Sequence, residues 1–138
     1  MKLEIEGLDE LIGGLENIMD LPRTVQRDML NAEADVVVRA QKKKIDELGL
    51  VDSGQLKASI ARERDIKTDR IGVCMDIRPQ GYRADGISNA EVGFVHEYGA
   101  PKRHIKASSW MRKANEECAD EAVKAAADVY EKFLQDNL

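Results

Sequence analysis

Two long stretches with helical periodicity constrain the fold of this chain more than any other feature. The first runs from residue 22 to about 48, and its apolar stripe comprises Val25, Met29, Ala32, Val36 and Ala40. The second runs from about 108 to 137, and its stripe comprises Met111, Ala114, Cys118, Ala122, Ala125, Val129 and Phe133. Spacings of three and four residues gather such side chains on one face of an α-helix. We therefore expect two long amphipathic helices, with Ser108 or Ser109 capping the second.

The N-terminal residues add a short strand and a shorter helix to this prediction. Residues 2–6 alternate between apolar and charged side chains, which is typical of a strand with one face in water. Residues 8–19 then return to helical spacing, and their apolar members are Leu8, Leu11, Ile12, Leu15, Ile18 and Met19. We expect a helix there that precedes the first long helix.

The middle of the chain has the pattern of a hairpin, a loop and a third strand. Asp52 and Gln55 have the spacing of a capping box, so a short helix or turn should begin there. Alternating apolar residues over 71–77 follow a turn signal at 68–69, which predicts a hairpin over 60–77. Residues 79–89 are polar and glycine-rich and should form an exposed loop. Residues 90–98 have strand-like composition.

These elements predict the α+β class. The strands cluster along the chain, which favours a small antiparallel sheet of about 3–4 strands packed against two long helices and one shorter N-terminal helix. A length of 138 residues and 43% hydrophobic content suit a single domain, 1–138. Its parts are the N-terminal strand and helices (1–50), the hairpin, loop and third strand (60–99), and the C-terminal helix (about 108–137).

The charge and composition argue against several classes of protein. A formal net charge of -5 is unusual for a free-standing nucleic-acid binder, although local basic patches are compatible with it. Cys74 and Cys118 lack the spacing of a metal or disulfide motif, so we expect two reduced thiols. No stretch approaches the length of a membrane span, and the N-terminus is too acidic for a signal peptide. We expect no membrane partner and cytosol-like conditions.

The stretch from Phe94 to Ala114 holds both histidines and the single tryptophan, yet its spacing does not predict catalysis. His96 and His104 are eight residues apart, whereas zinc-binding histidines on one helix are four apart. The sequence contains neither a nucleophile motif nor a phosphate-binding loop. We therefore expect a protein that is not an enzyme and has no metal or cofactor. A small metal-dependent enzyme built on the two histidines is the alternative that thermal-shift and elemental measurements would test.

Two loops are candidate assembly contacts. The residues with exposed cationic or aromatic character are Lys102, Arg103, His104 and Lys106 in one loop, and Tyr82 and Arg83 in the other. Cations in a loop can converge on a partner's carboxylates or on a phosphate backbone. We expect both loops to be mobile in the free protein and to order on assembly. The lysines of residues 41–44, by contrast, should form a solvated helix face.

The segments DSGQLKASI (52–60) and AEVGFVHEYGAPKRHIKASSWMRKANEE (90–117) together resemble a family of tailed bacteriophages and prophages. These are the neck and tail-completion proteins, often labelled tail-component or minor tail proteins. The matching residues are Asp52, Ser53, Gly54, Leu56 and Ser59, then Glu97, Tyr98, Gly99 and Ala100, and finally Ala107, Trp110, Met111 and Ala114. The chain departs from the family's pattern at three of its positions. Ser53 stands where threonine is usual, Ser109 where proline is common, and Trp110 where phenylalanine is.

The resemblance implies a structural protein of the virion neck that joins or completes the tail at the head-tail interface by ring-like self-assembly. The implied partners are copies of the chain and neighbouring connector or tail proteins, with DNA in the conduit as a further contact. The implied location is the virion, and the host cytoplasm before assembly. A DNA-contacting module that uses residues 102–106 is the alternative function.

A physical prediction accompanies this reading. Glu97, Tyr98 and Gly99 should shape a turn beside the N-terminus of the last helix, which begins near Trp110 and Met111. Gly99 should then have a positive φ, because a β-carbon is costly there. We expect at least one of the rings of Tyr98 and Trp110 to be buried.

Overall fold

The computed structural model describes residues 21–50, 54–68, 70 and 72–137. The helices in this part are α2 (Arg23–Glu47), α3 (Gln55–Ser59), α4 (Asn89–Tyr98), α5 (Trp110–Asp136) and the 3-10 helix η1 (Pro101–Arg103). The strands are β1 (Ile60–Arg62), β2 (Lys67–Thr68), β3 (Val73–Cys74) and β4 (Ile77–Pro79). The α+β class and both long helices are confirmed. The strand expected over 2–6, the helix over 8–19 and Asp52 itself lie outside the described residues. The short helix predicted after Asp52 is present as α3, but its N-cap is Gly54, so Gln55 is its first residue and not its third, as the predicted capping box requires.

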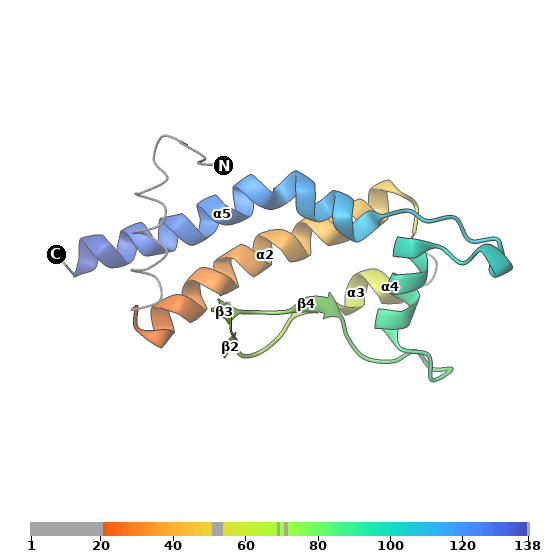
Figure 1. Ribbon diagram of the computed structural model, residues 1–138, viewed down its shortest axis with the longest axis horizontal. Helices are drawn as coiled ribbons and strands as arrows, with labels where there is room; N and C mark the ends of the chain where they lie inside the picture. The colour runs from red at the N-terminus through yellow and green to blue at the C-terminus, as the bar shows by residue number, and fades with distance from the viewer. Residues whose placement is uncertain (1–20, 51–53, 69, 71, 138) are drawn as a thin grey trace.

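Helices α2 and α5 lie side by side and antiparallel, and they form the long axis of the molecule (Figure 1). The residues of α5 that are buried are Trp110, Ala114, Cys118 and Ala122; the last three belong to the predicted stripe, and Trp110 is buried where Met111 was expected. Three of these four side chains are small, so the two helix backbones can approach closely along most of the seam. The predicted stripe of the last helix is thus its packing face.

Two polar contacts cross the seam between α2 and α5. They show that the predicted solvated face over 41–44 is wrong for Gln41 and Lys44. Gln41 is buried and its Nε2 donates to Asn115 Oδ1 at 2.9 Å. The Lys44 ammonium is also buried and lies 2.7 Å from a Glu117 carboxylate oxygen. Hydrogen bonds from Lys44 to Glu117 and Glu47 raise the pKa of the lysine. The polar residues are buried because α5 packs over them and supplies their partners.

The predicted hairpin is present, and all four described strands belong to it. β1 pairs with β4 and β2 pairs with β3, both antiparallel. Between these ladders one arm has four residues (63–66) and the other only two (75–76), so the register shifts. Such an extra stretch bends and twists a hairpin, and here it turns Ile66 into the buried side of the sheet.

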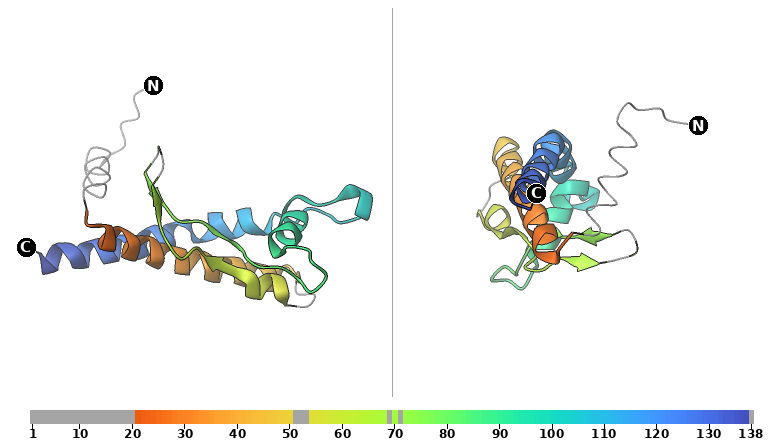
Figure 2. Two further views of the ribbon diagram at one scale, coloured as in Figure 1. Left: turned by 90° about the horizontal axis from the view of Figure 1, so that it is seen from below. Right: turned by 90° about the vertical axis from the view of Figure 1, so that its left-hand side faces the viewer.

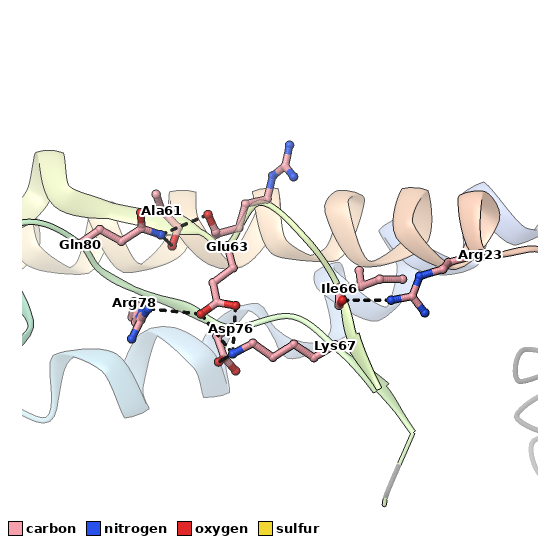
Figure 3. A network of polar contacts seen from close by, with 9 residues as sticks. Arg23, Ala61, Glu63, Ile66, Lys67, Asp76, Arg78 and Gln80 are labelled. Carbon is pink, nitrogen blue, oxygen red and sulfur yellow. Dashed lines mark hydrogen bonds and ion pairs between the residues drawn. The ribbon is translucent and has the colours of Figure 1, made fainter. Parts of the chain in front are cut away.

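Charged side chains bridge the two arms at this irregular point (Figure 3). Glu63 accepts ion pairs from both Lys67 and Arg78, at 3.0 Å and 3.3 Å. Lys67 also contacts Asp76 at 2.7 Å, and the hydrogen bonds to both carboxylates raise the pKa of this lysine. The Arg23 guanidinium donates to the Ile66 carbonyl oxygen at 3.1 Å, which ties the hairpin to the start of α2.

Residues 90–98 form helix α4, so the predicted third strand is wrong. Ser88 Oγ accepts a hydrogen bond from the Glu91 amide at 3.1 Å and caps the helix. This serine and glutamate have capping-box spacing, which outweighs the strand-like composition that follows. Helix α4 packs beside α3 and the first turns of α5 (Figure 1). The nearby core cluster consists of Ile45, Leu56, Ile60 and Trp110.

Candidate functional site

Gly99 ends helix α4 and begins the connection to α5. Its φ of +79° confirms the predicted positive value, and its amide donates to the Val95 carbonyl oxygen at 2.7 Å. A β-carbon at this position would lie 2.7 Å from the Ala107 nitrogen and 2.9 Å from the Ile105 carbonyl oxygen. Both of these are backbone atoms, which cannot swing aside as a side chain can. The turn therefore requires glycine for its conformation and for its space.

Glu97 caps the last helix from thirteen residues away in the sequence. Its carboxylate accepts hydrogen bonds from the Met111 amide at 2.7 Å and from the Arg112 amide at 3.2 Å. A negative charge at a helix N-terminus also interacts favourably with the helix dipole. Ser109 occupies the predicted N-cap position, but it has a φ of +52° and its side chain makes no cap bond. Ser108 instead donates its hydroxyl to the His96 carbonyl oxygen at 2.7 Å.

Trp110 closes the same unit from the inside. Its side chain is 0% exposed, and its indole Nε1 donates to the Gly93 carbonyl oxygen at 3.0 Å. A β-carbon on Gly93 would meet the indole ring at 3.2 Å, so α4 approaches the tryptophan at its glycine. The buried tryptophan confirms its predicted role in the core, and Met111 packs half-buried against the same cluster.

Tyr98 lies outside this core. Its ring is 67% exposed and contacts only Phe94 among the aromatic rings described, with ring centroids 4.7 Å apart. Phe94 is itself 63% exposed. Both rings border a shallow groove of about 530 Å³ between α4, α5 and β4. Of the two rings of which at least one was expected to be buried, Trp110 is therefore the buried one, and Tyr98 belongs to an exposed aromatic pair.

The residues beyond Gly99 form a projecting loop that we call the basic tip, residues 101–106. Ala100 and Ile105 pair across its base through hydrogen bonds of 2.9 Å and 3.1 Å. His104 has a φ of +57°, which turns the chain back toward the body. The four exposed cationic or titratable side chains of the tip are Lys102, Arg103, His104 and Lys106. No ion pair joins any of them to another side chain within the described part of the molecule.

The basic tip extends past the end of the helical body, next to α4 (Figure 2). The structure thus brings four of the predicted contact residues together in one turn. The other two are on a different loop, which Tyr82 and Ser88 close by a bridge. Tyr82 is 78% exposed beside a groove of about 630 Å³ along the hairpin. Arg83 pairs with Asp85 at 3.2 Å within its own loop.

The histidines and cysteines do not form a common site in the part of the chain that the structure describes. His96 belongs to α4, where its carbonyl oxygen accepts from Ser108, while His104 is exposed on the basic tip. Over residues 21–50, 54–68, 70 and 72–137, no cluster of three or more His, Cys, Asp or Glu side chains has metal-binding proximity. Burial raises the pKa of the Cys118 thiol, which donates to the Asn115 carbonyl oxygen. Among the described helices, none has the length and apolarity to cross a membrane.

A second candidate surface escaped the sequence analysis. It lies on the side of α5 opposite the seam with α2, and we call it the outer face of α5. Val123 is 63% exposed and Leu134 is 37% exposed, although both are apolar. The outer face consists of Glu116, Asp120, Val123, Ala127, Glu131 and Leu134, all exposed. Their spacing of three and four residues could have revealed this second face from the sequence. It was missed because the apolar stripe on the other side already explained the helical pattern.

Comparison of the chain with protein-family models, curated proteins and solved structures gave no match in any of the three. The resemblance to neck and tail-completion proteins therefore depends on the matching residues alone. Of these, Glu97, Gly99 and Trp110 are the residues that fix the joint between α4 and α5.

Proposed function

We propose that this chain is a non-enzymatic structural subunit of a tailed-phage neck. It would join or complete the tail at the head-tail interface by assembling with copies of itself into a ring. Connector and tail proteins on either side of the ring would be its other partners. The virion would be its final location, and the host cytoplasm its location before assembly.

The observation that carries this proposal is the construction of the joint. The residues that match the family's Glu-aromatic-Gly segment and its helix entry meet in space. Glu97 caps α5, Gly99 permits the close turn, and Trp110 fills the core beneath it. This joint holds the basic tip and the aromatic pair at the end of a helical frame. An assembly subunit needs such a fixed contact surface more than it needs a catalytic cleft.

Loss of the gene from the phage or prophage that carries it provides the direct test. We expect induced cells to release DNA-filled heads and tails that are not joined or not completed, with infectivity restored by the gene in trans. Electron microscopy of the released particles and plaque counts measure the two effects. Normal, infectious virions without the gene would overturn the proposal. A neighbourhood of portal, connector and major tail genes would support it, whereas a metabolic operon would count against it.

Contact with DNA is a second candidate function, favoured by the cations of the basic tip, which form no ion pair with any other described residue. Within a ring around a DNA conduit, this contact can coexist with assembly. Binding to duplex DNA should then weaken steeply as salt rises, because phosphate contacts release counterions. The variant Lys102→Ala/Arg103→Ala should lose this binding, and unchanged binding would exclude the tip as the DNA contact.

A further inference from the structure

Two surfaces of the described chain carry exposed large apolar side chains next to charged residues. The charges are positive on one of these surfaces and negative on the other. One surface combines the aromatic pair, Phe94 and Tyr98, with the basic tip. The other is the outer face of α5, where Val123 and Leu134 lie among carboxylates. Exposed apolar side chains that cluster with complementary charge mark protein contact sites on otherwise soluble domains.

The charges of the basic tip and of the outer face are one-sided, whereas the groove beside the aromatic pair is lined by charges of both signs, Glu116 of the same copy among them. The connection 99–109 contains three lysine or arginine residues and no acidic residue. Residues 116–136 contain seven acidic and two basic residues, a net charge of -5. The carboxylates of the outer face are Glu116, Asp120 and Glu131, and no described ion pair involves them. Within the described residues, each surface thus has charge without an ion-pair partner, which the other surface can neutralise.

The two surfaces cannot satisfy each other within one molecule along their full extent. The basic tip projects beyond the N-terminal end of α5, whereas the outer face follows that helix toward the opposite end of the body (Figures 1 and 2). A second copy, however, can present its outer face to the tip of the first. A contact between two different surfaces of identical chains is heterologous, and repeating it produces a ring when the rotation closes.

We infer that the basic tip and the aromatic pair of one copy dock on the outer face of α5 of the next copy. This inference rests on the proposed function and names the two surfaces that form its ring contact. Lysine and arginine of the tip pair with carboxylates of the outer face, while the aromatic rings, whose centroids lie 4.7 Å apart, cover Val123. DNA is the less suitable partner for the aromatic pair, because an acidic chain of net charge -5 repels it outside the tip.

Charge reversal tests the contact in the full-length protein. The tip variant is K102E/R103E/K106E, and the helix variant is E116K/D120K/E131K. Exposed ion pairs are individually weak, so three lost pairs should weaken self-association roughly tenfold in each variant. Sedimentation equilibrium of the purified protein at about 0.15 M salt, near the 8 Å screening length, measures the dissociation constant. The control R39E/R64E/R70E changes the net charge on other surfaces by the same amount and sign as the tip variant does, and it should leave the constant within about twofold.

Recombination of the changes decides whether the two surfaces meet. A chain that carries both reversals should regain wild-type association, and so should an equimolar mixture of the two single-surface variants. Circular dichroism melts establish that each variant is folded. Failure of both recombinations, or an equal loss in the control, would overturn the inference.

The remaining outcomes separate this contact from the proposed function. If the wild type assembles and both variants assemble equally well, the ring forms through other surfaces and only this inference fails. A wild type that stays monomeric at every concentration up to about 1 mM would overturn both. If the tip variant loses duplex DNA binding but not self-association, the tip's partner is DNA and the inference is wrong.

Discussion

Substitution of Gly99 by alanine isolates the close turn on which the joint depends. Gly99 has φ +79° and ψ 171°, a backbone conformation that costs any residue other than glycine about 1–3 kcal/mol. The added β-carbon would also lie 2.7 Å and 2.9 Å from two backbone atoms, so the base of the basic tip must move. Loss of one hydrogen bond between Ala100 and Ile105 would add about 1 kcal/mol. We expect Gly99→Ala to lower the free energy of unfolding by about 2–4 kcal/mol.

Gly86 supplies a matched control for this experiment. Its φ is +86°, similar to that of Gly99, but a β-carbon there would meet no atom within 4 Å. Gly86→Ala should therefore cost only the backbone term, about 1 kcal/mol. Urea unfolding followed by the fluorescence of Trp110, the chain's single tryptophan, gives both values. Equal losses in the two variants would refute the argument that backbone crowding at Gly99 fixes the turn.

Four further predictions follow from the described contacts. Glu97→Ala should lower the free energy of unfolding by about 0.5–2 kcal/mol through loss of the α5 cap, and a denaturation curve superimposed on the wild type would contradict this. Burial raises the pKa of the Glu33 carboxyl above 4.5, so its ionised form destabilises the fold. Glu33→Gln should thus be more stable than the wild type at pH 7, and the difference should vanish as the pH falls below about 4.5; thermal melts across that range measure it. At pH 8 iodoacetamide should modify Cys118 more slowly than the half-buried Cys74, as peptide mapping would show; the reverse order would contradict the burial of Cys118. The Ile105 amide donates to the Ala100 carbonyl oxygen, so hydrogen exchange in the free and the assembled protein tests the prediction that the tip orders only on assembly; fast exchange in the free protein alone would support it, and equal protection in both would contradict it.

The two long helices could be predicted from sequence because their signals are local and sustained. Helix α2 ends just before Gly49, whose φ of +68° is typical of a glycine that follows a helix, and α5 packs through Ala114, Cys118 and Ala122 of the predicted stripe. Helix α4 could not be distinguished from a strand by its composition, because its ten residues are too few to show a clear helical period. Its capping pair, Ser88 and Glu91, was a local signal that the composition of the following residues obscured.

The rest of the site depends on contacts between distant residues. Glu97 caps α5 only after the connection has folded back, so no local pattern near Ser109 indicates it. Gln41 and Lys44 are buried because α5 brings Asn115 and Glu117 to them, whereas their own polarity indicates solvent. Sequence predicted the cations of the tip, but only the fold shows that they share one turn beside an aromatic pair.

The antiparallel pair of long helices also gives the molecule two distinct ends at a known separation. Helix α5 has 27 residues, which at 1.5 Å per residue span about 40 Å from the joint to Asp136. The basic tip lies at one end of this length, and the C-terminal end of α5 lies at the other (Figure 1). A heavy label fused behind α5 would therefore leave the tip unobstructed. In images of an assembled particle, the radial position of that label would reveal whether the tips point toward the central channel or toward the periphery.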